Sequence, residues 1–188
     1  MIGQKLANTS TYNKFLILRN VKIPLIRIQI GDDGSFRKSR KIDISILTPN
    51  NNGRQHVEYV KQFICMFPQI KPLFYVIKKL TYSYRLNDPL NFGIRSFAIF
   101  LMLIIFMQEP HHDNLGGLLL KFLYKFGYAC DYDYEDNGRM MVVNLPDPIN
   151  AKNNIGKNAD AFSLQRMFKT AYLILHTRDA QNRLEYLF

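Results

Sequence analysis

The chain has only two cysteines and no apolar stretch long enough to cross a membrane. Cys65 and Cys130 lack Cys-x-x-Cys spacing, so they predict neither a metal site nor a disulfide framework and favour a reducing compartment. The stretch 97–107 is apolar on every side but follows Arg95, and its 11 residues fall short of the roughly 20 that a membrane span needs. The N-terminus has no charged segment followed by an apolar one, so we expect no signal peptide and no membrane partner.

Acidic residues are scarce in the first half of the chain. Residues 1–100 contain 16 Lys and Arg against 5 Asp and Glu, whereas 101–188 contain 9 against 10. A basic half predicts a polyanionic partner, most often nucleic acid. The composition, 47% apolar and 13% aromatic in 188 residues, indicates a globular chain with one core, or one domain and part of another.

Two segments, 21–30 and 41–47, alternate apolar and polar residues as half-buried strands do. The polar loop GDDGSFRKSR separates them, so we expect an antiparallel pair. Asp43 then lies on the polar face beside Arg27 or Gln29. A carboxylate on a sheet face is a ligand type for two-metal chemistry, but this strand supplies only one, so the spacing alone favours a surface aspartate.

Most of the remaining chain has helical periodicity, with apolar residues three and four apart. The predicted helices cover 55–67, 70–84, 97–107, 115–126 and 163–175, the third of them a buried central helix. We expect Asp113 or Asn114 to cap the fourth helix, Gly127 to end it at its C′ position, and Ser163 to cap the last one. Residues 11–18 are expected to form the end of a helix or an irregular lead-in.

Three side chains would meet if 70–84 and 97–107 packed as a helical hairpin. The charge of Lys78, the hydroxyl of Ser96 and the ring of Phe97 suit the phosphates, a hydrogen bond and the base of a nucleotide. Taken alone, a solvated Lys78 and a core Phe97 are the better interpretation. In LPDPINAKNNIGKN the amides of Asn153 and Asn154 could read a base edge, and an ordinary structured loop is the alternative.

The order of these motifs carries a family resemblance. NVKIPLIRIQI, KIDISI, FPQIKPLFYVIKKL, RLNDP, GIRSFAIFLMLIIFMQ, NLGGLLLKFLYKFG and DPINAKNNIGKN follow one another between residues 20 and 175. This series resembles the non-canonical poly(A) polymerases and terminal uridylyltransferases of the DNA polymerase beta-like superfamily, with the TRAMP-type adenylyltransferases most similar. The resemblance implies an α+β fold. An incomplete nucleotidyltransferase palm of short antiparallel strands at 1–49 would precede a mainly helical central, PAP-associated domain at 50–188, with a nucleotide recognition loop near 144–158.

The resemblance also implies roles for single residues. Asp43 matches the third catalytic carboxylate, which helps bind the catalytic Mg²⁺ or Mn²⁺ and activate the primer hydroxyl. Lys78 matches the lysine that holds the triphosphate of ATP, and Ser96 matches the serine that assists it. Phe97 stands where the family has a tyrosine that stacks on the base.

Asn153 and Asn154 match the recognition loop, with Asn154 where an aspartate is common. Tyr82 occupies the position of a second phosphate-binding lysine, and Pro146 replaces a frequent glutamate. The family's Gly-Ser loop and Asp-x-Asp strand have no match in residues 1–40. With one carboxylate where three are needed, we expect two-metal catalysis to fail in this chain alone.

Two hypotheses follow. In the first, the chain is part of a template-independent RNA 3′-end nucleotidyltransferase, truncated or completed by another chain, that transfers AMP, or less favourably UMP. In the second, it is a catalytically dead RNA- or protein-binding module derived from that family. A helical scaffold without a nucleotide site is a third hypothesis, which the order of the motifs disfavours. By resemblance, the partners are an RNA 3′ end and a zinc-knuckle RNA-binding protein, and the location is nuclear, or otherwise cytoplasmic.

Overall fold

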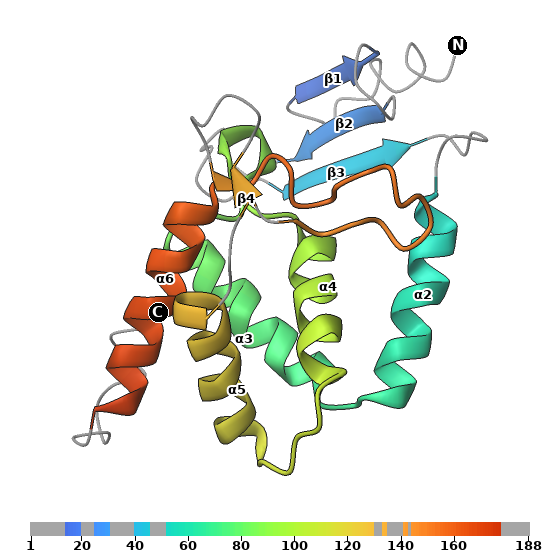
Figure 1. Cartoon of the computed structure of the whole chain (residues 1–188). Helices are drawn as coiled ribbons and strands as arrows, with labels where there is room; N and C mark the ends of the chain where they lie inside the picture. Colours follow the sequence, from blue (N-terminus) through green and yellow to red (C-terminus); the bar gives the residue numbers. More distant parts are fainter. Residues whose placement is uncertain are drawn as a thin grey trace. The chain divides into compact units, whose positions relative to one another are not determined.

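The computed structural model describes residues 14–19, 25–30, 40–45, 52–129, 133–134, 141–142 and 144–177. The chain divides into two compact units, Met1–Arg54 and Gln55–Phe188. The first contains a three-stranded antiparallel sheet and the second is mainly helical, so the predicted α+β class is confirmed (Figure 1). The family's domain types, a palm over 1–49 and a PAP-associated domain over 50–188, stay predictions.

The sheet has the order β1-β2-β3. Its strands are Lys14–Leu18, Leu25–Ile30 and Arg40–Ser45. The predicted antiparallel pairing of the second and third strands is confirmed, and its register places Arg27 opposite Asp43. The prediction of a helix end or an irregular segment over 11–18 is wrong for its described part, because KFLIL pairs along its whole length with β2.

One face of this sheet leaves isoleucines in solvent. Ile28 in the central strand is 4% exposed, whereas its neighbour across the strand pair, Ile42, is 46% exposed. Ile44 is 44% exposed and Ile17 is 40% exposed, and both pair with Ile26. Adjacent exposed β-branched side chains are typical of a surface that another element covers.

The helical unit contains five described α-helices. They are α2 (Gly53–Met66), α3 (Ile70–Ser83), α4 (Ser96–Met107), α5 (Leu115–Tyr124) and α6 (Ala161–His176). Shorter elements are η1 (Pro89–Asn91), a π-helical turn η2 (Lys125–Ala129), and the strand pair β4 (Asp133–Tyr134) and β5 (Met141–Val142). Of the helices in the described ranges, none combines the length and apolarity that spanning a bilayer requires.

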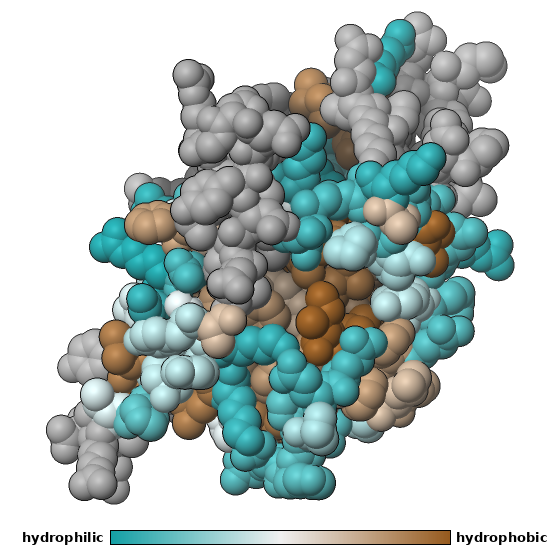
Figure 2. All heavy atoms as spheres, viewed as in Figure 1, coloured by the Kyte–Doolittle hydropathy of each residue, from teal (hydrophilic) through white to brown (hydrophobic). Residues whose placement is uncertain are grey.

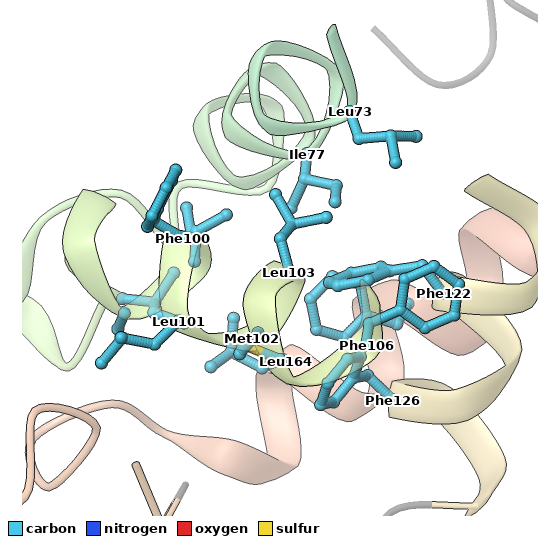
Figure 3. Packing of buried hydrophobic residues seen from close by; sticks show 14 of the residues in the cluster. Leu73, Ile77, Phe100, Leu101, Met102, Leu103, Phe106, Phe122, Phe126 and Leu164 are labelled. Atoms are coloured by element: carbon cyan, nitrogen blue, oxygen red, sulfur yellow. The ribbon is translucent and has the colours of Figure 1, made fainter. Parts of the chain in front are cut away.

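Helix α4 is the buried centre that its sequence predicts. Figure 1 shows it between α2 on one side and α3 and α5 on the other. Phe106 on α4 meets Phe122 of α5 edge to face at 5.6 Å, and Phe122 meets Phe168 of α6 in the same way at 5.6 Å. Figure 3 shows that α3, α4, α5 and α6 contribute side chains to one apolar cluster. Phe97, in the first turn of α4, is only partly buried.

Two of the predicted helix ends differ in the structure. The last helix is capped by Asp160, whose Oδ1 accepts the backbone N–H groups of Phe162 and Ser163, so the prediction of Ser163 as the cap is wrong. Gly127 does not end α5, because the chain continues through η2. The predicted cap Asn114 is confirmed, since its side chain accepts the N–H of Gly117 at 2.9 Å.

Candidate functional site

The ring of Phe97 has an aromatic partner on another helix. The imidazole of His56, near the start of α2, lies with its centroid 4.4 Å from that of Phe97 and with the two planes at 39°. The backbone of Arg95 is extended just before α4, so Ser96 and Phe97 form the first turn of the helix. Phe97 therefore lies at a helix end, where part of its ring stays accessible, rather than in the middle of the core.

His56 also reaches the loop 144–158, which was predicted to recognise the nucleotide. Its Nε2 lies 2.8 Å from Oδ1 of Asp147, and the Asp147 side chain is only 3% exposed. The Asp147 carboxylate also accepts the backbone N–H of Ile149 at 2.9 Å and the side-chain amide of Asn153 at 3.0 Å. One buried carboxylate thus joins α2 to the loop.

These hydrogen bonds set the ionisation of Asp147. Burial alone would raise the pKa of its carboxyl, but the bonds from His56, the Ile149 N–H and Asn153 together outweigh burial and lower the pKa. Asp147 is therefore an ionised acceptor at neutral pH. Since an ionised carboxylate only accepts hydrogen bonds, Nε2 of His56 is the donor in their contact.

The two asparagines of the loop have different contacts. Asn154 Oδ1 accepts the backbone N–H of Leu145 at 3.0 Å and that of Gly156 at 2.9 Å, which fastens the two sides of the loop together. Asn153 donates from Nδ2 to Asp147. The loop is therefore an ordered structure, and the side-chain oxygen of Asn154 is engaged in holding its shape.

A cavity of about 400 Å³ lies beside Phe97. Its lining comes from three helices and is mostly apolar: Val60 and Ile64 of α2, Lys71, Phe74 and Tyr75 of α3, and Ser96, Phe97 and Phe100 of α4. The ammonium of Lys78 lies 5.7 Å from the centroid of the Phe74 ring. Lys78 thus lies beside Phe74, which lines the same cavity as Ser96 and Phe97. Figure 2 shows hydrophobic side chains over α4 in the middle of the helical unit, with hydrophilic ones around them.

Asp43 belongs to the sheet unit. Its two carboxylate oxygens each accept from the Arg27 guanidinium at 2.7 Å. Mg²⁺ requires several oxygen ligands, and within the described part of the chain no three His, Cys, Asp or Glu side chains gather to hold a metal. Among the described residues, Asp43 therefore has no further carboxylates beside it for the metal site that the family resemblance implies, and it is held by Arg27.

Another cavity lies away from every predicted site residue. It encloses about 830 Å³ between the loop after α4, α5 and α6. Two lysines in its wall have carboxylate partners: Lys121 bonds Asp113 at 2.7 Å, and Lys125 bonds Glu109, which lowers the pKa of Glu109. Charges paired in this way leave little attraction for a phosphate, so volume alone does not make this cavity the nucleotide site.

Sequence reasoning missed His56 and Asp147. The sequence Asp147-Pro148-Ile149-Asn150 is a signal for a turn in which an aspartate accepts following N–H groups, and it could have identified Asp147 as structural. His56 gave no comparable signal. A single histidine in a polar helical turn does not indicate that it meets residues 41 and 91 positions further along the chain.

Comparisons with known proteins agree with the motif order. The inactive non-canonical poly(A) RNA polymerase protein Trf4-2 of Drosophila melanogaster is 25% identical over 138 residues, covering 57% of this chain and 34% of its own. Poly(A) RNA polymerase gld-4 of Caenorhabditis elegans is 31% identical over 108 residues, covering 52% of this chain and 12% of its own. Poly(A) RNA polymerase cid14 of Schizosaccharomyces pombe is 26% identical over 146 residues, covering 63% and 21%. The chain thus spans about a third or less of the length of these relatives.

Solved structures share the fold. The polymerase core of TRAMP, an RNA surveillance complex, superposes with a TM-score of 0.74 at 18% identity, covering 98% of this chain and 63% of its own. A mutant of the Cid1 poly(U) polymerase bound to MgATP gives a TM-score of 0.69 at 17% identity, covering 93% of this chain and 71% of its own. No protein-family model matches the chain.

These findings confirm the predicted resemblance. The homologues of this chain are non-canonical poly(A) polymerases, and its α+β fold is that of the poly(A) and poly(U) polymerase cores. In sequence the chain is thus similar to nucleotidyltransferases of the non-canonical poly(A) polymerase type, and in fold it is similar to the solved polymerase cores.

Proposed function

We propose that this chain supplies the nucleotide-binding and RNA-binding part of a template-independent RNA 3′-end nucleotidyltransferase that transfers AMP from ATP by a two-metal mechanism. The observation that carries the proposal is the joining of Phe97 to the loop 144–158 through His56 and Asp147. This contact places a stacking ring next to an amide-bearing loop. A ring for the base face and amides for its edge are the elements that base recognition requires.

In this proposal the remaining residues have separate tasks. The exposed ammonium of Lys78 attracts the triphosphate, and the Ser96 hydroxyl donates a hydrogen bond to it. Phe97 stacks on the base, and Asn153 reads the base edge. Asn154 maintains the shape of the loop, because its side-chain oxygen accepts two backbone N–H groups.

We expect nucleotide binding to depend on the ring at position 97. Phe97→Ala should weaken ATP binding about tenfold or more, because stacking on one aromatic side chain contributes roughly 1–3 kcal/mol. Phe97→Tyr should bind as the parent does, and Lys78→Ala should weaken binding most at low salt. The measurement is the fluorescence titration of a labelled ATP analogue into residues 1–188.

Lys121→Ala is the matched control, since Lys121 lies in the other cavity and already bonds Asp113. It should leave the affinity unchanged. Equal affinities of the parent, Phe97→Ala and Lys78→Ala would rule out this nucleotide site.

In this proposal the first two catalytic carboxylates come from outside residues 1–188. Asp43 is offered as the third carboxylate, which would have to exchange its Arg27 contact for a metal. Mg²⁺ or Mn²⁺ would supply charge neutralisation and activation of the primer hydroxyl. The exposed isoleucines of β1 and β3 support docking of a further palm segment that carries the missing Gly-Ser and Asp-x-Asp motifs.

We expect residues 1–188 alone not to extend RNA. A labelled oligo(A) RNA incubated with Mg²⁺ or Mn²⁺ and each nucleotide in turn should keep its length, because one carboxylate neither positions two ions nor neutralises them. Extension with ATP that disappears in Asp43→Ala would contradict this and would show that the chain supplies all its metal ligands.

The second candidate is a catalytically dead RNA- or protein-binding module. It is favoured by the Asp43 carboxylate being held by Arg27, and one of the relatives is itself described as inactive. Salt-dependent binding of oligo(A) RNA without any nucleotide binding would favour this candidate. A zinc-knuckle RNA-binding partner and a nuclear location remain proposals by resemblance.

A further inference from the structure

We propose that His56 is a positioning residue of the nucleotide site, which holds the recognition loop 144–158 against the ring of Phe97 and thereby sets base preference. This inference rests on the proposed function and deepens it. His56 has two contacts of different kinds, one with each part of the site. The centroid of its ring lies 4.4 Å from the centroid of the Phe97 ring. Its Nε2 donates a hydrogen bond to the Asp147 carboxylate at 2.8 Å.

The loop has its own internal bonds, but these do not fasten it to the helices. The backbone N–H of Asp147 donates to the carbonyl of Asn153 at 2.8 Å, and that of Ile155 donates to the carbonyl of Leu145 at 2.8 Å. Such bonds fix the shape of the loop, while its two ends are anchored by Leu145, which is 2% exposed in the apolar cluster, and by the N–H of Asp160, which donates to the carbonyl of Phe92 at 2.9 Å. Between these ends, the bond from His56 of α2 to Asp147 acts on the position of the segment that carries Asn153.

The path from His56 to the base-reading side chain is short. Asp147 Oδ1 accepts from His56, and Asp147 Oδ2 accepts from Nδ2 of Asn153. A displacement of the imidazole therefore moves the carboxylate and with it the amide of Asn153. Because a buried carboxylate that loses a donor must find another or admit water, the arrangement resists small displacements.

Base preference is the property that this linkage would control. Attraction of the triphosphate by Lys78 is the same for every nucleotide, whereas the fit of the base depends on the amide of Asn153 relative to the ring of Phe97. Discrimination by hydrogen bonds requires that the site be held in place when the wrong base is present. Loosening the loop should thus reduce discrimination more than it reduces overall affinity.

The two contacts of His56 can be separated by substitution. His56→Gln keeps a donor for Asp147 without the aromatic ring, and His56→Phe keeps a ring for Phe97 without the donor. His56→Ala removes both. Val57→Ala is the matched control, because Val57 is the next residue of the same helix and its side chain is 51% exposed.

The first readout needs no nucleotide. Hydrogen exchange of residues 144–158 in the full chain should rise about tenfold or more in His56→Ala and His56→Phe. His56→Gln should restore most of the protection. Exchange in α5 and α6 should stay as in the parent, which shows that the unit remains folded.

The second readout is the ratio of ATP to UTP affinity, measured with labelled analogues. His56→Ala should bring this ratio at least threefold closer to one, whereas Val57→Ala should leave it unchanged. If loop exchange and the affinity ratio are both unchanged in His56→Ala, the inference is overturned even though nucleotide binds. If the parent binds neither nucleotide, the proposed function fails, and unchanged loop exchange in His56→Ala would then overturn the positioning role separately.

Discussion

Asp147→Ala should lower the free energy of unfolding of the helical unit by about 3 kcal/mol. The substitution removes a carboxylate that is 3% exposed and leaves the donors of His56, Ile149 and Asn153 without their acceptor. Unsatisfied buried donors are costly because water does not replace the lost partner. Chemical denaturation followed by circular dichroism measures the change.

Asp113→Ala is the appropriate control. Asp113 also pairs with a cation, Lys121, but the lysine side chain is 56% exposed and the aspartate is 28% exposed. Surface pairs of this kind contribute about 1 kcal/mol or less. Similar losses in the two variants would mean that the Asp147 network carries no special share of the stability.

The Asp147 network also gives a pH dependence with a definite sign. The folded pKa of Asp147 is lowered from its ordinary value of 3.8, so the unfolded chain binds the proton more readily. The resulting stabilisation is fully present above pH 3.8 and is lost as the pH falls through the lower folded pKa. The difference in stability between the parent and Asp147→Asn should therefore shrink as the pH falls below 3.8.

Gly127→Ala should destabilise the protein by about 2 kcal/mol, the scale of overpacking a tight contact. An added Cβ at this position would lie 2.9 Å from the backbone nitrogen of Lys169 and 3.1 Å from its Cα. Backbone atoms of α6 cannot rotate away as a flexible side chain would, so η2 and α6 would have to separate. Thermal unfolding measures the loss.

Gly116→Ala provides the opposite expectation in the neighbouring helix α5. The nearest atom to an added Cβ there is Oδ1 of Asn114 at 3.5 Å, an ordinary contact. Replacing a helical glycine by alanine should be neutral or stabilising by up to about 1 kcal/mol, because alanine has less backbone entropy to lose. Equal effects of the two substitutions would contradict the close approach of α6 at Gly127.

Most elements could be predicted from local pattern. The apolar residues of 97–107 predicted a buried central helix, and α4 is buried on nearly all sides. Alternation predicted the pairing of β2 and β3, because a strand with one buried face has period two. The segment 14–18 was missed because KFLIL has no alternation, and its strand state comes from pairing with β2.

The roles of single residues could not be predicted from the spacing of apolar and polar residues alone. Gly127 is the residue type that often ends a helix. Whether a glycine ends a helix or allows another backbone to approach depends on what packs against it, and here the backbone at Lys169 does so. Ser163 and Asp160 are both good capping residues, and the position at which the chain leaves the loop decides between them.

The sequence by itself determined the class of the fold and the order of the motifs, because periodicity and turn composition are properties of neighbouring residues. It also identified Lys78, Ser96, Phe97 and Asn153 as candidates. Only the tertiary structure decided that His56 and Asp147 join Phe97 to the loop 144–158, and that Arg27 holds Asp43. These contacts join residues 16 to 91 positions apart, so they depend on how strands, helices and loops pack, and no local spacing encodes that packing.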